Sequence, residues 1–177
     1  MTDRDAAFTE YFAARSGAMR GTAYLLCGDW QRAEDLVQTT FAKLYLAWRR
    51  ISRHEVLDAY TRQTLVRTFV SEGRRGWFRL ERVAEQAGDD RIAESTGLPE
   101  ERLVLLAALA KVPPRQRAVL VLRYWEDLAV EETARLLGCS TGTVKSQAAR
   151  GLQTLRGLLD TTAPDDFEIG RGIDGRA

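Results

Sequence analysis

The sequence predicts an all-α fold: two small helical domains joined by a flexible linker, the second with a helix-turn-helix. Apolar residues recur at intervals of three and four along most of the chain, which is the period of a helix rather than of a strand. The length of 177 residues accommodates two small domains. Between about residues 81 and 97 the apolar periodicity fades and the charge changes sign, which indicates a linker between two domains.

The first two helices are expected over residues 5–26 and 30–48. The first has apolar residues on one face at Phe8, Phe12, Met19, Ala23 and Leu26. The second repeats this stripe at Ala33, Val37, Phe41, Leu44 and Trp48. Between them, Gly28 can occupy the left-handed position that ends a helix, and Asp29 can accept the first free N–H groups of the next helix. We therefore expect a tight corner between these helices.

A third helix is expected over residues 57–72, where apolar pairs lie four positions apart. Gly73 and Gly76 follow and are expected to end it. Between residues 58 and 82, six arginines oppose three acidic residues, which gives this segment a net charge of +3. The third helix therefore offers a basic surface.

An acidic linker is expected after this helix. Between residues 85 and 101, six acidic residues oppose a single arginine, which gives a net charge of −5. Glycine and proline in the same segment disfavour a continuous helix. The predicted boundaries are 5–78 for the first domain, 79–97 for the linker, 98–159 for the second domain, and 160–177 for a disordered tail.

The second half restarts with helical patterns separated by proline and glycine. Pro99 and Pro114 each suit the first position of a helix, since proline there lacks only an N–H that would have no partner. The expected helices are Pro99–Lys111, Pro114–Trp125, Val130–Leu137, and a longer helix that Ser140 caps and that runs to about Leu159.

The last two of these helices have the pattern of a helix-turn-helix. Ala134 is small where the two helices approach, Gly138 lies at the turn, and Val144 is the apolar residue that the second helix buries. Between residues 138 and 159 there are three basic and no acidic residues. The pattern predicts that the second helix enters the major groove of DNA, with a simple helical corner as the alternative.

Composition excludes several classes of protein. No segment approaches the length of apolar sequence that a membrane helix needs, and the first residues lack a signal-peptide pattern, so we expect a soluble, cytoplasmic protein. Two distant cysteines, Cys27 and Cys139, and one histidine provide too few ligands for a structural zinc site. No phosphate-binding loop or nucleophile–base set is present, so we expect no cofactor and no enzymatic activity.

Three segments in order resemble the sigma-70 family of RNA polymerase sigma factors, specifically its short, two-domain extracytoplasmic-function (ECF) group. The first segment is Ala33-Glu34-Asp35-Leu36-Val37-Gln38-Thr39-Thr40-Phe41. The second is Pro113-Pro114-Arg115-Gln116-Arg117-Ala118-Val119-Leu120. The third is Leu137-Gly138-Cys139-Ser140-Thr141-Gly142-Thr143-Val144-Lys145-Ser146. The resemblance extends over nearly all of residues 8–159.

The resemblance implies a function in transcription initiation. A sigma-2 domain at about residues 5–75 would bind core RNA polymerase and recognise and open the −10 promoter element. A sigma-4 domain at about residues 98–159 would read the −35 element. The implied partners are core RNA polymerase, through its β′ clamp and β flap, and promoter DNA. ECF members usually have an anti-sigma factor, so such a protein is a further implied partner.

The resemblance, together with the chemistry of the side chains, gives three sets of site residues. The expected −35 contacts are Ser140, Thr141, Thr143, Lys145, Ser146, Gln147 and Arg150. The expected −10 contacts are Ser52, Arg53, His54, Arg62, Arg67, Arg74 and Arg75. The expected core polymerase contacts are Asp35, Leu36 and Gln38.

Two departures from the family pattern and one alternative function bear on these assignments. Gln147 stands where the family often has arginine, so the −35 preference is open. Residues 53–60 lack the Trp-Leu pair frequent at the start of the −10 helix. The alternative function is a helix-turn-helix transcriptional regulator with a helical sensor or dimerisation domain. The segment Asp35–Gln38 and the basic third helix favour the sigma factor, because a simple regulator has no need of either.

Overall fold

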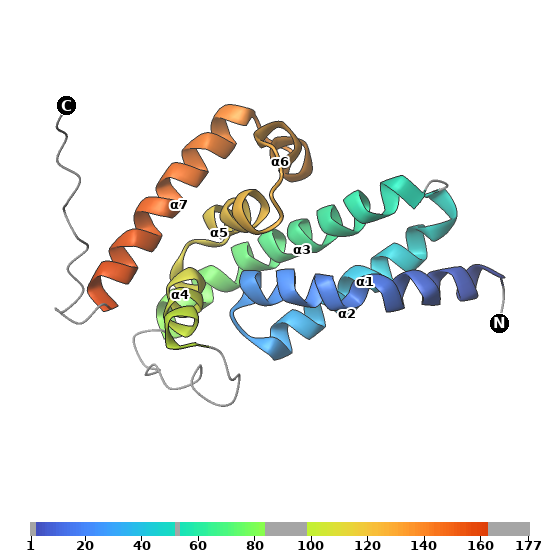
Figure 1. Ribbon diagram of the computed structural model, residues 1–177, viewed down its shortest axis with the longest axis horizontal. Helices are drawn as coiled ribbons and strands as arrows, with labels where there is room; N and C mark the ends of the chain where they lie inside the picture. Colours follow the sequence, from blue (N-terminus) through green and yellow to red (C-terminus); the bar gives the residue numbers. More distant parts are fainter. Residues whose placement is uncertain (1–2, 52–53, 84–98, 163–177) are drawn as a thin grey trace, which may run out of the picture.

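The computed structural model describes residues 3–51, 54–83 and 99–162, and every regular element in these ranges is a helix (Figure 1). The elements are α1 (Asp3–Cys27), α2 (Trp30–Ala47), η1 (Trp48–Arg50), α3 (His54–Val83), α4 (Glu100–Lys111), α5 (Pro114–Leu120), η2 (Val121–Trp125), α6 (Val130–Leu137) and α7 (Thr141–Thr162). The predicted all-α fold class is confirmed. The predicted linker after residue 83 and the tail after residue 162 lie outside the described residues.

The predicted corner between the first two helices is confirmed. Gly28 has a φ of 69°, in the left-handed region that glycine adopts without steric cost. The Asp29 carboxylate accepts a hydrogen bond from the backbone N–H of Arg32 at 2.8 Å, and so caps α2. Beyond the corner, α1 and α2 pack along their apolar faces, where Phe12 and Phe41 meet edge to face.

The third helix is longer than the sequence predicts. It continues through Gly73 and Gly76 to Val83, so the predicted end at residue 72 is wrong. An interior glycine costs a helix only about 1 kcal/mol, an amount that tertiary contacts readily offset. At Gly73 such a contact is visible: a Cβ built there would lie 2.9 Å from Cβ of Pro114, so α5 approaches α3 more closely than a side chain would allow.

The four predicted helices of the second half are present. Pro114 begins α5, and the same helical path continues as η2, a single π-helical segment that covers the rest of the predicted Pro114–Trp125 helix. Helix α6 has the predicted bounds, and α7 extends a few residues beyond the predicted end. Both α4 and α5 pack against α7, which brings the C-terminal elements together.

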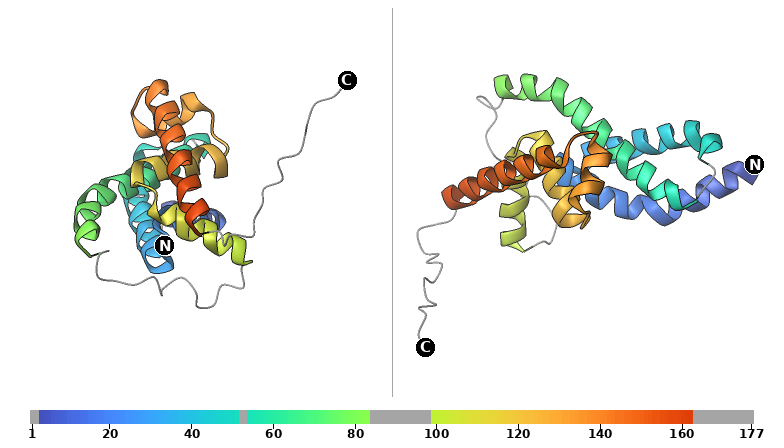
Figure 2. Two further views of the ribbon diagram at one scale, coloured as in Figure 1. Left: turned by 90° about the vertical axis from the view of Figure 1, so that its left-hand side faces the viewer. Right: turned by 90° about the horizontal axis from the view of Figure 1, so that it is seen from above.

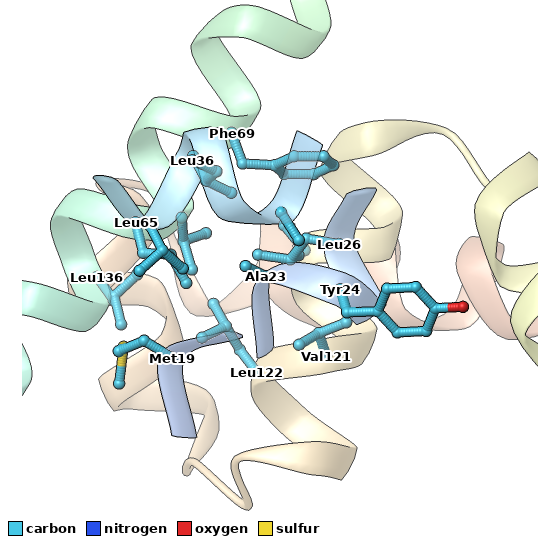
Figure 3. Close-up of a cluster of buried hydrophobic side chains, with 14 of the residues drawn as sticks. Met19, Ala23, Tyr24, Leu26, Leu36, Leu65, Phe69, Val121, Leu122 and Leu136 are labelled. Carbon is cyan, nitrogen blue, oxygen red and sulfur yellow. The ribbon is translucent and has the colours of Figure 1, made fainter. Parts of the chain in front are cut away.

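The N-terminal half (α1–α3) and the C-terminal half (α4–α7) share one hydrophobic core. Figure 3 shows Leu26, Leu65 and Phe69 of the first half in one cluster with Val121, Leu122 and Leu136 of the second. Helices α5 and α6 lie against α3, as the views of Figures 1 and 2 agree. The sequence predicts two domains joined by a flexible linker, and it does not predict that the two halves pack closely against each other.

Candidate nucleic-acid interface

The helix-turn-helix consists of α6 and the first turns of α7. Ala134 and Val144 are buried and pack together with Val119 of α5. Gly138 ends α6 with a φ of 65°, and the N–H of Cys139 donates to the carbonyl of Ala134 at 3.0 Å. The three residues that predict the motif therefore have the predicted positions: the close approach, the turn and the buried apolar contact.

The start of α7 is fixed by its own hydroxyl groups. The Ser140 hydroxyl accepts a hydrogen bond from the backbone N–H of Thr143 at 3.1 Å, which satisfies a donor that the helix end leaves free. Ser146 donates to the carbonyl of Thr143 at 3.0 Å. The hydroxyls of Ser140 and Ser146 are exposed and already have local partners. Any hydrogen bond that they form with DNA would therefore be additional to these local bonds.

The exposed face of α7 carries most of the predicted −35 residues. Thr141, Lys145 and Arg150 are exposed, while Thr143 and Gln147 are half-buried. The basic residues of the helix have no acidic neighbour on it, because α7 contains no acid before Asp160. This face combines positive charge with neutral hydrogen-bonding groups, which is the composition that binds phosphates and base edges.

The structure brings two of the predicted −10 residues into contact with the C-terminal half. Arg62 Nε donates to Glu126 Oε2 at 3.0 Å, across the junction of the two halves. Arg67 Nε donates to the carbonyl of Leu136 at 3.0 Å, although the residue as a whole remains exposed. In this arrangement both guanidinium groups bond to protein atoms.

The other predicted −10 residues are described only in part. Arg74 and Arg75 lie in the second half of α3, and His54 begins it, but their side chains lie outside the described residues. Ser52 and Arg53 lie outside the described residues altogether.

The predicted core polymerase residues separate onto two sides of α2. Asp35 and Gln38 are exposed and lie one turn apart, so they share a surface. Leu36 is only 2% exposed and packs in the core, because it lies on the side of α2 that carries Ala33 and Val37. The structure therefore gives Leu36 a packing role instead of the surface position that the prediction requires.

Sequence reasoning missed Arg117, the most buried charged residue of the molecule's described part. It is 6% exposed, and its guanidinium donates to the carbonyls of Leu26 at 2.6 Å, Val112 at 2.8 Å, and Ala110. It also lies 5.7 Å from the centre of the Phe69 ring. Burial lowers the pKa of this guanidinium to about 10. An arginine beside an unbroken apolar run, Ala118–Leu122, was the available signal.

Glu126 is the second residue that sequence reasoning missed. Its carboxylate accepts hydrogen bonds from Arg62 and from the hydroxyl of Thr22, so it joins α1 and α3 to the segment after η2. Nothing in the sequence around Glu126 indicates partners so far away along the chain.

An apolar groove lies at the surface between the two halves. It is lined by Leu25 of α1 together with side chains of α4, η2 and α7. Tyr124 and Trp125 at its edge are 61% and 62% exposed, which is unusual for large aromatic side chains and indicates a surface for a partner. None of the described helices is long and apolar enough to cross a membrane. In the same residues, no three potential metal ligands gather into one group.

Comparison with known proteins matches both halves of the chain. Residues 12–79 match the family profile described as Sigma-70 region 2, and residues 102–155 match Sigma-70, region 4. The RNA polymerase sigma-E factor of Streptomyces antibioticus is 38% identical over 174 residues, which cover 96% of this chain and 89% of that protein. The RNA polymerase sigma-E factor of Streptomyces coelicolor is 37% identical, with 96% and 90% covered.

Solved structures have the same fold. The sigma factor RpoE of Bartonella quintana, solved in complex with the anti-sigma factor NepR, has a TM-score of 0.67 and 25% identity, over 89% of this chain and 99% of that one. CnrH, solved in complex with the cytosolic domain of CnrY, has a TM-score of 0.62 and 22% identity, over 90% of this chain and 91% of that one.

Proposed function

Because this chain belongs to the sigma-70 family of RNA polymerase sigma factors, in its ECF group, we propose that it joins core RNA polymerase, directs it to a promoter and assists promoter melting. Proteins of this family are initiation factors rather than enzymes. The observation that carries the proposal is the occurrence of region 2 and region 4, in that order, with a relative that matches almost the whole chain.

Reading of the −35 element is assigned to the exposed face of α7. Lys145 and Arg150 supply the positive charge for phosphate contacts, and Thr141 lies at the N-terminal end of the helix, which reaches the base edges in helix-turn-helix proteins. Gln147 can form a paired hydrogen bond with adenine, which makes it the candidate for base selection on this face.

Recognition and melting of the −10 element are assigned to the basic set on and before α3. Arg62, Arg67, Arg74 and Arg75 supply charge along one helix, which suits the phosphates of an exposed strand. Ser52, Arg53 and His54 precede or begin that helix and supply hydrogen-bonding groups for an unstacked base.

Two surfaces are assigned to the polymerase. The exposed pair Asp35 and Gln38 on α2 is proposed to contact the β′ clamp. The apolar groove beside Tyr124 and Trp125 is proposed to receive the β flap, because exposed aromatic side chains around a groove are typical of a protein-binding surface. The chain would work in the cytoplasm, where the polymerase is.

An anti-sigma factor is proposed as a further partner. The similar sigma factor RpoE of Bartonella quintana was solved in complex with the anti-sigma factor NepR. A partner of this kind would control access of the chain to core polymerase.

Run-off transcription with purified core RNA polymerase tests the proposal. We expect the chain to direct initiation from defined positions on promoter templates, and the isolated chain to bind the same duplex DNA weakly. Strong, sequence-specific binding by the isolated chain, with no effect on initiation by core polymerase, would instead support a helix-turn-helix regulator.

A further inference from the structure

We propose that the chain segment after α7 docks in the apolar groove beside Tyr124 and Trp125, through Phe167 and Ile169, and competes there with the polymerase. We call residues 163–169 the tail segment; they lie outside the described residues. The competition rests on the proposed function, in which the groove receives the β flap. The docking itself concerns two parts of one chain and does not depend on that function.

The groove suits apolar side chains of a peptide segment rather than a small-molecule ligand. Its lining comes from α1 (Leu25), α4 (Leu105 and Leu109), α7 (Leu152 and Leu155), and from α5 and η2. None of the described residues that line it is charged. Its volume is about 240 Å³, below the roughly 300–1,000 Å³ of pockets that enclose small-molecule ligands. One or two apolar side chains would therefore fill it.

Three large apolar side chains at the groove are left exposed to solvent. Leu105 is 44% exposed, and Tyr124 and Trp125 are more exposed still. Exposed apolar side chains that gather around an apolar groove are typical of a surface that a partner covers. Within the described residues no segment covers them, so the cover comes from another molecule or from a part of the chain beyond these residues.

The groove lies close to the end of α7, where the tail segment begins. Leu152 and Leu155 line the groove, and Leu159, one turn further along the same face, is half-buried. From Leu155 to Thr162, the last residue of α7, the distance along the helix axis is about 10 Å. Figures 1 and 2 show this end of α7 beside α4, which forms another part of the lining.

The tail segment has the length and the side-chain pattern that the groove requires. Its sequence is Ala163-Pro164-Asp165-Asp166-Phe167-Glu168-Ile169. Pro164 disfavours continuation of the helix because it has no backbone N–H. Five residues of extended chain span about 17 Å, so Phe167 can turn back as far as Leu155. Phe167 and Ile169 are two positions apart, which places both side chains on one side of an extended chain.

Arg156 offers the acidic tail segment a cationic partner beside the groove. It is exposed on α7 and lies four positions after Leu152, on the same face of the helix. Among the described residues no acidic side chain forms an ion pair with it, and this includes Asp160 one turn further on. Docking of Phe167 brings the neighbouring Asp166 and Glu168 toward this guanidinium. An exposed pair of this kind contributes little affinity, but it favours one orientation of the segment.

Attachment to α7 strengthens a contact that would be weak between separate molecules. A short connection gives the attached segment a local concentration of about 1 mM. A segment that binds the groove with a Kd of about 0.1 mM when separate would then occupy it in roughly nine of ten molecules. A partner of the groove would find it free in about one molecule in ten, so the apparent affinity of that partner falls about tenfold.

Photo-crosslinking of the full chain tests the docking directly. The photoreactive residue p-benzoylphenylalanine replaces Phe167, and mass spectrometry of the illuminated chain identifies the residues to which it becomes linked. We expect links to α4, η2 and the C-terminal part of α7. The matched control places the same residue at Ile173, an apolar position beyond the tail segment, and should give far fewer links to these elements. A mixture of isotope-labelled and unlabelled chains shows whether the links lie within one chain.

Titration of the labelled full chain with core RNA polymerase tests the competition. The double variant Phe167→Ser with Ile169→Ser removes both apolar side chains and leaves every described residue unchanged. We expect it to bind core polymerase about tenfold more tightly than the wild-type chain does, since its groove is always free. Ile173→Ser is the matched control and should bind with wild-type affinity. Circular dichroism establishes that all three chains have the same helix content.

The docking is overturned if the photoreactive residue at position 167 links to the groove no more often than at position 173. Links that join labelled to unlabelled chains also overturn it, because they show that a second copy occupies the groove. Wild-type polymerase affinity in the double variant overturns the competition. Run-off transcription separates these outcomes from the proposed function: transcription without groove links refutes only the docking, and groove links without transcription refute only the sigma function.

Discussion

Arg117 is a buried cation whose partners are backbone carbonyls rather than an acid. The carbonyls of Leu26, Ala110 and Val112 cannot be removed by mutation, so they lose their donors when the guanidinium is lost. Each buried acceptor without a partner costs about 1 kcal/mol or more. The residue therefore stabilises both the C-terminal half and its contact with α1.

We expect Arg117→Met to lower the free energy of unfolding by about 3 kcal/mol, from three deprived carbonyls. Chemical denaturation followed by circular dichroism measures the change. Arg115→Met, two positions away on the same helix and only half-buried, should change it by less than about 0.5 kcal/mol. Equal effects of the two substitutions would contradict the role given to Arg117.

Cys27 is a poor nucleophile in the folded chain. Burial raises the pKa of its thiol from 9.0 to about 11, because it disfavours the charged thiolate. The folded state thus keeps a proton that the unfolded state loses, so the contribution of this group to stability is full below pH 9 and falls as the pH rises from about 9 to about 11.

Near neutral pH we expect iodoacetamide to alkylate Cys27 about a hundredfold more slowly in the folded chain than in the unfolded chain, since reactivity follows the thiolate fraction. Mass spectrometry of the peptide that contains Cys27 gives both rates. The same alkylation rate in the folded and the unfolded chain would show that the Cys27 thiol is not buried and that its pKa is not raised.

Residues whose role is local could be predicted, and those with distant partners could not. Asp29, Ala134, Gly138 and Val144 act within a few positions of themselves, so spacing alone places them. The bond of Arg117 to Leu26 spans 91 positions, and that of Glu126 to Thr22 spans 104. No local pattern contains such information, because it depends on how complete helices pack.

Among the helices, the starts that have a clear sequence signal were predicted well, whereas the end of α3 was predicted wrongly. Proline or a capping residue fixes the starts of α2, α5 and α7, whereas the end of α3 was inferred from Gly73 and Gly76. Glycine lowers helix stability only slightly, and at Gly73 its missing side chain lets α5 approach. Gly73, which the sequence suggests as the end of a helix, lies inside α3 and makes room for the packing of α5.

The basic face of α7 should control the electrostatic part of promoter binding. We expect Lys145→Ala and Arg150→Ala each to lower promoter affinity of the polymerase-bound chain and to reduce the slope of log affinity against log salt by about one. Gln153→Ala, exposed further along α7, is the control. Unchanged slopes in both basic variants would show that this face does not meet DNA.

The exposed face of α2 should contribute to polymerase binding. We expect Asp35→Ala and Gln38→Ala each to weaken association with core RNA polymerase by about tenfold, as truncation of a central interface residue does. Titration of the labelled chain with core polymerase measures this affinity. The control is Gln31→Ala, on the exposed start of α2. Normal affinity in both variants would place the polymerase contact elsewhere.

At the scale of the whole molecule, the fold class, the helix order and the two regions could be predicted, but the contact between the halves could not. A sequence shows that each half has an apolar face, and the same face can pack within its own half or across to the other. The net charge of +1 is likewise a sum: basic helices at α3 and α7 are offset by acidic residues elsewhere. The positions of the charges along the chain, rather than the net charge, indicate where the chain can bind DNA.

We propose that this chain gives core RNA polymerase its choice of promoter, through two separate DNA-reading regions. The most direct test maps the 5′ ends of transcripts that core polymerase makes from a library with randomised upstream sequence, with and without the chain. We expect chain-dependent transcripts that share two upstream elements at a fixed separation. Transcripts that share no upstream sequence, or that are the same with core polymerase alone, would contradict it.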